Sequence, residues 1–249
     1  MTSGPVAIDA AGLHYSELNR SLWEAVRSGQ RHIELRNVCG PRYIGTNLGE
    51  PVRLDIFGTP GNDLGAFMDG PTIVVHGNAQ DGCGNTMNEG LIVVHGRAGD
   101  IAGLSARGGK IFVRDSVGYR VGIHLKEYEA KRPCLVVGGT AQDFLGEYMA
   151  GGVLVVLGLN RQEGEPYRAR FIGTGMHGGV IYLRGQVEEH QLGREVGVAD
   201  LNAEDCAILE GLVGEFCRHF GHDEGDILGA RFVKLWPLSL RPYGRLYAY

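Results

Sequence analysis

The chain has 249 residues, a formal net charge of −5, five cysteines and 41 glycines. Its length allows a large hydrophobic core without a metal or disulfide staple, and its glycine content is well above the usual share of roughly 7%. The negative charge argues against nucleic acid or an anionic membrane as a partner. The odd number of cysteines is typical of reduced thiols in a cytoplasmic protein, and no apolar run is long enough to predict a membrane span.

Residues 1–29 predict one short helix. Apolar residues recur at helical spacing from Leu18 to Val26, Ser16 is the expected N-cap, and Gly29 can end the helix in a left-handed conformation. We expect this helix to cap the repeats that follow, because an open-ended stack of strands exposes its edge and its core.

Residues 30–190 repeat with a period of about twenty residues. The segment TIVVHG at 72–77 returns 19 residues later as LIVVHG at 91–96. The aliphatic runs begin at Ile33, Leu54, Ile73, Ile92, Ile111, Leu135, Leu154 and Ile181, and each has a second Ile, Leu or Val two positions on. This alternation indicates strands with one buried face, and the repetition indicates that they stack. The predicted fold class is all-β, a parallel β-helix of about eight coils.

The links between the strands repeat as well. Equivalent corners hold Asp63, Asp81, Asp100 and Asp143, and a glycine opens each following strand. Glycine adopts positive φ angles at no steric cost, and Asp can hydrogen-bond to its own backbone in a turn. These carboxylates could serve catalysis or bind a cation, but their repetition favours a role in the turns.

Longer spacings between strands predict inserted loops within 116–131 and 160–170. Residues 126–129 and 147–149 are polar enough for an interface, although a solvated loop is the simpler interpretation. The loop at 160–170 is charged, and it is either functional or simply solvated.

Residues 191–249 predict a C-terminal helix and an extended tail. Apolar residues at helical spacing run up to Phe220, and Gly221 follows as the expected end of the helix. Phe232 to Trp236 is an expected strand, and an aromatic tail runs from Arg241 to Tyr249.

The residue between the two inward positions of each run points to the outer face of the sheet. Six consecutive members of this row are apolar, and we call them the outer stripe: Val74, Val93, Phe112, Val136, Val155 and Tyr182. Because neighbouring strands lie about 4.8 Å apart, a monomer would not leave a stripe of this length in water. We expect the C-terminal helix or another polypeptide to cover it, and the apolar face of the helix favours the helix.

Three motifs could carry chemistry, and the sequence favours a structural role for each. Residues 173–178 read Gly-x-Gly-x-x-Gly, but a dinucleotide site needs a helix after this motif, and here a strand follows. His76 and His95 occupy equivalent places in adjacent coils, yet a zinc site needs three or four ligands. No nearby base can be named for Cys83 or Cys134. The sequence therefore predicts no catalytic, cofactor-binding or metal-binding residue.

Two segments resemble a known family. Residues 121–128 (VGIHLKEY) and 136–152 (VVGGTAQDFLGEYMAGG) closely resemble the C-terminal glycine-repeat domain of the large subunit of glutamate synthase, and the similarity extends over about residues 30–190. That domain is in turn similar to one subunit of formylmethanofuran dehydrogenase and to one of N-methylglutamate synthase. The resemblance implies a right-handed parallel β-helix without a catalytic residue, a flavin or an iron–sulfur ligand.

The chain departs from the complete large subunit. Thr2 stands where that subunit has its N-terminal cysteine nucleophile, and an FMN barrel and a cysteine cluster are missing. The resemblance therefore implies a separate, non-catalytic structural subunit of a cytoplasmic glutamate synthase or a related redox complex. Its expected partners are an amidotransferase (glutaminase) subunit and an FMN and iron–sulfur synthase subunit. FMN, iron–sulfur clusters and NAD(P)H are expected on those partners, and no cofactor is expected on this chain.

Two other hypotheses stay open. The chain could be the scaffold of a formylmethanofuran dehydrogenase-like, N-methylglutamate synthase-like or electron-bifurcating complex, and the identity of the co-purifying chains would decide this. Alternatively, it could be an enzyme with a site on one face of the β-helix, and intrinsic turnover by the purified chain would favour that hypothesis.

Overall fold

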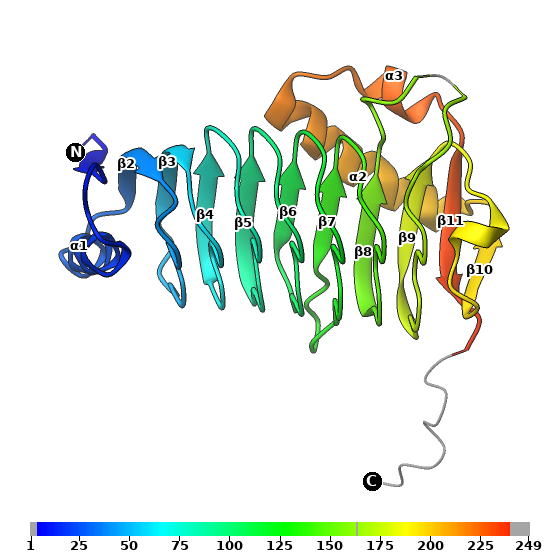
Figure 1. The fold of residues 1–249 in the computed structure, drawn as a ribbon, viewed down its shortest axis with the longest axis horizontal. Helices are drawn as coiled ribbons and strands as arrows, with labels where there is room; N and C mark the ends of the chain where they lie inside the picture. The colour runs from blue at the N-terminus through cyan, green and yellow to red at the C-terminus, as the bar shows by residue number, and fades with distance from the viewer. Residues whose placement is uncertain (1–3, 163, 240–249) are drawn as a thin grey trace, which may run out of the picture.

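The structure is a computed structural model that describes residues 4–162 and 164–239 (Figure 1). The strands are β1 (Val6–Asp9), β2 (His32–Cys39), β3 (Arg53–Thr59), β4 (Asp69–Val75), β5 (Glu89–Val94), β6 (Lys110–Val113), β7 (Cys134–Val137), β8 (Ala150–Val156), β9 (Gly178–Arg184), β10 (Val196–Ala199) and β11 (Phe232–Pro237). The helices are α1 (Tyr15–Arg27), α2 (Ala203–Phe220), α3 (Glu224–Leu228) and the short 3-10 helix η1 (Glu189–Gln191).

The strands form one sheet of 11 strands in the order β1 to β9, then β11 and β10. Strands β1 to β9 are parallel, and the predicted inward residues pair in register, from Ile33 opposite Leu54 to Leu154 opposite Ile181. The predicted all-β parallel β-helix is therefore confirmed. The solenoid has about six turns, slightly fewer than the expected eight coils. A full turn needs a strand and the connection to the next strand. The eight strands β2 to β9 are joined by only seven connections, so the number of strands is larger than the number of full turns.

Side chains from the strand and from the facing turn of each coil fill the interior of the solenoid. The two inward residues of every strand from β2 to β9 are at most 2% exposed. The facing turns add two more residues to the same core, such as Cys83 and Met87 in one coil and Leu145 and Met149 in another. A fully buried aliphatic side chain contributes about 1.5–3 kcal/mol, so this continuous core is the main source of stability.

The turns explain why the chain is rich in glycine. In the turn before β8, Phe144, Gly146 and Tyr148 have φ angles of 64, 67 and 52°, so left-handed residues occupy alternate positions. The central residue must be glycine, because a Cβ at Gly146 would lie 2.6 Å from Cδ1 of Ile181. The outer two positions point away from the core, and they accept larger residues at a cost of roughly 1–2 kcal/mol each.

The N-terminal segment differs from the expectation in two ways. The buried face of α1 contains the expected Leu18 and Val26, but the N-cap is His14 rather than Ser16, which lies within the helix. The side chain of Glu17 accepts a hydrogen bond from the backbone N–H of His14, and this contact fixes the start of the helix. In addition, β1 was not predicted, and it extends the parallel ladder by pairing with β2.

Antiparallel strands close the other end of the sheet. Strand β11 confirms the strand predicted at 232–236 and pairs with β9, whereas β10, which was not predicted, pairs with β11. Helix α2 ends at Gly221 in a left-handed conformation, as expected. The predicted tail at 241–249 lies outside the described residues. Within the described part of the chain, no helix is long and apolar enough to cross a membrane.

Candidate functional site

The register places the outer stripe in one row across the sheet. Its members pair from strand to strand in the order Val74, Val93, Phe112, Val136, Val155 and Tyr182. All are buried, with exposed fractions between 0 and 7%. The outer face of the sheet is therefore covered along this row.

Helix α2 covers the C-terminal part of the outer stripe. One buried cluster contains the last four residues of the stripe together with Leu209, Leu212, Val213, Phe216 and Cys217 of α2. An ion pair between Lys110 of β6 and Glu215 of α2, at 2.5 Å, flanks this contact. Of the two coverings that the sequence left open, the helix of the chain itself occupies this part of the stripe.

A buried carboxylate fixes the start of α2 on the sheet. Asp205 is 3% exposed, and it accepts hydrogen bonds from the hydroxyl of Tyr182 at 2.6 Å and from Nζ of Lys234 at 2.9 Å. Burial favours the neutral acid, but the backbone N–H of Asn202 and the side chains of Lys234 and Tyr182 together lower the pKa of Asp205. This network sets the position of the helix and holds no free nucleophile or base.

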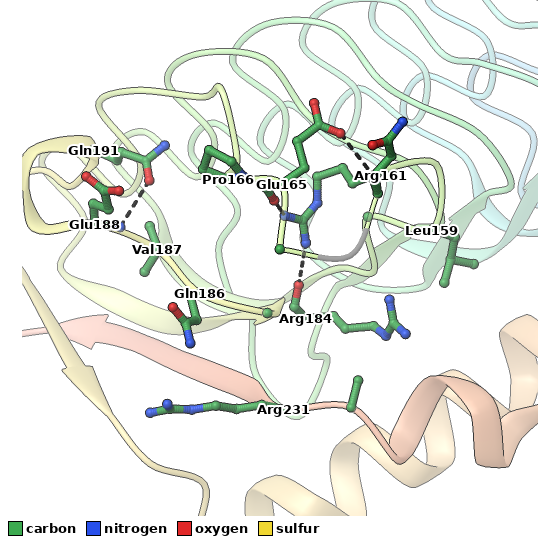
Figure 2. Close-up of a pocket in the computed structure, with 15 residues that line it drawn as sticks. Leu159, Arg161, Glu165, Pro166, Arg184, Gln186, Val187, Glu188, Gln191 and Arg231 are labelled. Carbon is green, nitrogen blue, oxygen red and sulfur yellow. Dashed lines mark hydrogen bonds between the residues drawn. The ribbon is translucent and has the colours of Figure 1, made fainter.

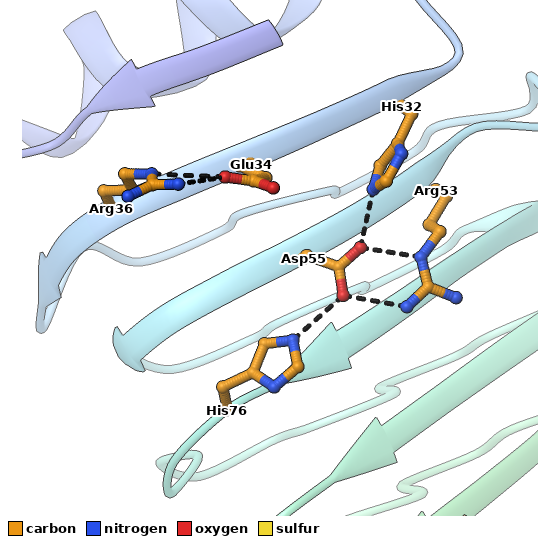
Figure 3. Close-up of polar contacts among 6 residues, drawn as sticks. All are labelled: His32, Glu34, Arg36, Arg53, Asp55 and His76. Carbon is orange, nitrogen blue, oxygen red and sulfur yellow. Dashed lines mark hydrogen bonds and ion pairs between the residues drawn. The ribbon is translucent and has the colours of Figure 1, made fainter. Parts of the chain in front are cut away.

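A second buried carboxylate lies on the part of the outer face nearer the N-terminus (Figure 3). Arg53 donates two hydrogen bonds to Asp55, at 2.6 and 2.8 Å, and the Nε2 atoms of His32 and His76 lie 2.8 and 2.9 Å from its oxygens. Burial opposes the ionised form, yet the bonds from Arg53, His76 and His32 lower the pKa of Asp55 to about 2. We call this group the Asp55 centre.

Sequence analysis missed the Asp55 centre, although the register contains the signal. His32 pairs with Arg53 across β2 and β3, and Asp55 lies two residues beyond Arg53 on the same face. His76 directly follows β4, next to the end of β3. Four polar side chains therefore meet on one face because the strands are parallel, and this is visible only when the sequence is written coil under coil.

The histidines weighed as metal ligands belong to a stack of rings. The rings of His76 and His95 lie 5.6 Å apart and nearly parallel, Phe57 stacks on His76 at 4.5 Å, and Phe220 of α2 packs edge-on against His95. Burial, followed by the positive charges of His76 and Arg114, lowers the pKa of His95. Among the described residues, no group of three or more His, Cys, Asp or Glu side chains could hold a metal ion.

A cavity of about 860 Å³ lies where the inserted loop at 160–170 meets the end of β9 and the start of β11 (Figure 2). Arg161 donates hydrogen bonds to the carbonyl oxygens of Glu165 and Arg184, and its guanidinium lies 3.7 Å from the centre of the Tyr167 ring. The side chains of Arg184 and Arg231 point away from one another in Figure 2. Arg161 therefore ties the loop to β9, and the arginines do not converge on one ligand position.

The other motifs from the sequence lie in the repeating frame. Residues 173–177 lead into β9, and Gly178, the last glycine of the motif, is the first residue of that strand. Oδ1 of Asp81, Asp100 and Asp143 accepts the backbone N–H of Asp100, Tyr119 and Arg170, respectively, each in the following coil. Oδ1 of Asp63 accepts a hydrogen bond from the side chain of Asn85. These carboxylates therefore connect successive coils.

Of the two candidate thiols, Cys83 is buried and Cys134 is partly buried. Burial raises the pKa of Cys83 to about 12 and raises the pKa of Cys134 as well. A thiolate is the reactive form of cysteine, so neither side chain is poised as a nucleophile near neutral pH.

The segment 147–149, which the sequence suggested as an interface, contains one buried and one exposed polar residue. Glu147 is 6% exposed and pairs with Arg120, whereas Tyr148 is 47% exposed and stacks on His124 at 5.4 Å. One such stack contributes about 0.5–1.5 kcal/mol. The left-handed backbone of Tyr148 costs roughly 1–2 kcal/mol, so stacking and backbone cost are of similar size. In the segment 126–129, Tyr128 is 52% exposed and pairs with Lys131 in an antiparallel bridge.

Comparison with known proteins places the chain in a family. The chain is 50% identical over 250 residues to the uncharacterized protein MJ1350 of Methanocaldococcus jannaschii, covering 97% of this chain and 96% of that protein. Its structure is similar to a chain of the formyltransferase/hydrolase complex FhcABCD from Methylorubrum extorquens, solved with methylofuran. The TM-score is 0.62 at 19% identity, over 96% of this chain and 94% of that chain, so the likeness is one of fold. Residues 25–238 match the GXGXG motif family, and the chain belongs to that family.

Proposed function

We propose that this chain is a non-catalytic structural subunit of a multi-subunit complex, and that the complex is a glutamate synthase or a related flavin and iron–sulfur redox enzyme. The observation that carries the proposal is the ladder of parallel strands from β2 to β9, in which the inward residues of each strand pair with those of the next. The segments at 121–128 and 136–152, which resemble the glycine-repeat domain of glutamate synthase, lie within this ladder.

The physical role of such a subunit is to hold partner sites at a fixed separation and orientation. Each coil packs on its two neighbours through a continuous core, so the body resists bending, and reacting groups on different subunits gain from fixed geometry. In the proposed complex, an amidotransferase subunit releases the amide nitrogen of glutamine. A synthase subunit carrying FMN and iron–sulfur clusters then delivers this nitrogen to 2-oxoglutarate, with NAD(P)H as the reductant.

Affinity purification of the tagged chain from its own host tests this proposal. Mass spectrometry of the purified material should identify an amidotransferase subunit and an FMN and iron–sulfur synthase subunit in stoichiometric amounts. When the isolated partners are recombined, formation of glutamate from glutamine and 2-oxoglutarate should require this chain. Full glutamate synthesis by the partners alone would contradict a structural role.

The fold likeness to a chain of FhcABCD favours one alternative, a scaffold in a formyl-transferring complex. Recovery of formyltransferase or hydrolase subunits in the same purification would support this alternative over glutamate synthase. The hypothesis of an enzyme site on the β-helix face has the Asp55 centre as its most polar candidate. Turnover by the purified chain that is abolished in Asp55→Asn would support it.

A further inference from the structure

The sheet ends in an edge strand that has a free side for hydrogen bonding. Among the described strands, β10 is the last of the ladder, at the opposite end from α1 (Figure 1). The backbone N–H of Leu238 donates to the carbonyl oxygen of Glu195, and in an antiparallel ladder every second residue bonds to the same neighbour. Gly197 and Ala199 therefore bond to β11, whereas the N–H and C=O groups of Val198 point away from the sheet.

The inward face of this edge is apolar and open. Val198 lies opposite Leu235, and Leu235 lies opposite Ile181, so Val198 is the last member of one inward column of the solenoid. Ile181 and Leu235 are fully buried, but Val198 is 54% exposed. The end of a stack of repeats normally carries a polar cap, so an exposed apolar side chain in this place indicates a contact surface.

The outward face of the same edge is apolar as well. Trp236 and Leu238 are 43% and 59% exposed. A Cβ at Gly197 would lie 2.8 Å from Nε1 of Trp236 and 2.8 Å from Cδ2 of Leu238, so both side chains lie over the edge strand. At the other edge of the sheet, Val6 and Ile8 of β1 are partly buried. Strand β10 therefore combines a free edge with apolar surface on both faces, and such an edge pairs readily with another strand.

The hydrogen-bonding pattern of the edge allows it to pair with a second copy of itself. Residues 194–200 read Arg-Glu-Val-Gly-Val-Ala-Asp, with Gly197 at the centre. When two such strands run antiparallel about Gly197, Val196 of each copy lies opposite Val198 of the other. The N–H of Val196 already donates to the carbonyl oxygen of Gly193 at 3.1 Å, but its C=O is free to accept the N–H of Val198 from the other copy.

The charges of the edge match in the same register. Pairing about Gly197 places Arg194 of each copy opposite Asp200 of the other, and opposite charges directly across two strands stabilise the pair. Both side chains are exposed, and within the chain Asp200 has only a long contact with Arg231, at 3.8 Å. The alternative register, centred on Val198, would place Asp200 opposite an apolar residue. The edge is therefore complementary to itself in one register.

We propose that two copies of this chain pair through β10, antiparallel about a two-fold axis at Gly197, and form a dimer with one continuous sheet. A two-fold axis lets both copies use the same surface, as in most homodimers. On the inward face, Val196 of one copy covers Val198 of the other, and on the outward face Trp236 of each copy reaches over Gly197 towards the axis. The inference goes beyond the proposed function, because it predicts two copies of the scaffold in the complex, whichever catalytic subunits that scaffold binds.

An exchange of charges tests the register. Sedimentation equilibrium of the purified full-length chain at several concentrations gives the dissociation constant of the dimer. Arg194→Asp and Asp200→Arg should each raise this constant roughly tenfold or more, because each variant places like charges across the interface. The double variant Arg194→Asp/Asp200→Arg should restore the wild-type value, because the exchanged charges match again. Arg231→Ala is the matched control, since it removes the contact of Asp200 within its own copy and should leave the dimer unchanged.

Val198→Pro tests the pairing of the strands separately from the charges. Proline is tolerated on an edge strand where the missing N–H would face outwards, so circular dichroism should show a folded chain, and sedimentation should show a monomer. A wild type that is monomeric at every concentration would overturn the proposal, whether β10 then pairs within its own chain or with a different protein. A dimer that persists in Val198→Pro would also overturn it, as would a double charge variant that dimerises no better than the single variants.

Discussion

At Gly84, backbone conformation and packing both exclude a side chain. The residue has a φ of +71°, and an added Cβ would lie 2.4 Å from Cδ1 of Ile111 in the core. Gly12 has the same φ of +71°, but no atom lies within 4 Å of the Cβ position. The two glycines therefore separate the cost of the left-handed conformation from the cost of the steric clash.

Gly84→Ala should lower the free energy of unfolding by about 2–4 kcal/mol, of which roughly 1–2 comes from the conformation and the rest from overpacking. Gly12→Ala, the matched control, should lose only the conformational part, roughly 1–2 kcal/mol. Urea denaturation of both variants measures the difference. Equal losses in the two variants would mean that the core relaxes around the new methyl group and that the positive φ angle alone explains why residue 84 is glycine.

The Asp55 centre predicts a loss of stability in acid. The pKa of Asp55 is about 2 in the folded chain against an ordinary value of 3.8, because the hydrogen bonds from Arg53, His76 and His32 outweigh its burial. As the pH falls, the unfolded chain therefore binds the proton first, so the stabilisation is complete above about pH 4 and disappears towards pH 2. Allowing for solvent screening, we expect it to amount to about 1–2 kcal/mol.

Unfolding free energies of the wild type and Asp55→Asn, measured from pH 7 to pH 2, test this prediction. The difference between the two proteins should be largest at neutral pH and should shrink between pH 4 and pH 2. Asp200→Asn is the control, because its side chain is 94% exposed and it should not change the profile. A difference that does not depend on pH would contradict the assignment of the proton to Asp55.

Among the elements, α2 has the most specific fit to the sheet. Phe216 is fully buried, and an added Cβ at Gly138 would lie 2.6 Å from Cζ of its ring. The missing side chain at Gly138 therefore provides the space that the ring occupies. Asp205 fixes the first turn of the helix through Tyr182, and Phe216 fixes its last turns.

Phe216→Ala should destabilise the chain by about 3–5 kcal/mol, because it removes a buried ring and leaves a cavity over the sheet. Glu210→Ala is the control, since Glu210 lies on the exposed side of the same helix. Chemical denaturation gives the loss, and limited proteolysis shows whether α2 detaches first. A loss below about 1 kcal/mol in Phe216→Ala would mean that the helix is not tightly packed on the outer stripe.

For the whole molecule, the sequence predicts the repeating strands, the two long helices and β11, and it misses two short strands outside the repeat and the Asp55 centre. Repetition identified both the inward columns and the outer stripe, because parallel strands in register convert a period in the sequence into neighbours in space. Strands β1 and β10 lie outside the repeat, so no equivalent segment of a neighbouring coil reveals them, whereas β6 and β7 are equally short and were predicted from the repeat. The Asp55 centre joins residues from β2, from β3 and from the position directly after β4, so its parts lie far apart along the chain.

The length of α2 matches the number of strands that it covers. Its 18 residues span about 27 Å at 1.5 Å per residue. Strands spaced about 4.8 Å apart fill that length with between five and six strands. The buried cluster beneath the helix contains residues from β6, β7, β8, β9 and β11. Removing a coil should therefore have different effects inside and outside this part of the sheet.

Two deletions of one coil each test this match. Removing residues 72–90 joins Pro71 to Leu91 outside the cluster beneath α2, and removing residues 134–152 joins Pro133 to Val153 beneath the helix. Both delete 19 residues at equivalent register positions, so both lose one layer of the core. Only the second leaves α2 about 4.8 Å too long for its sheet, which exposes apolar side chains at one end. We expect thermal unfolding, monitored by circular dichroism, to show a clearly larger loss of stability for the second deletion. Equal losses of stability would mean that α2 adjusts its position and that its length is not matched to the ladder.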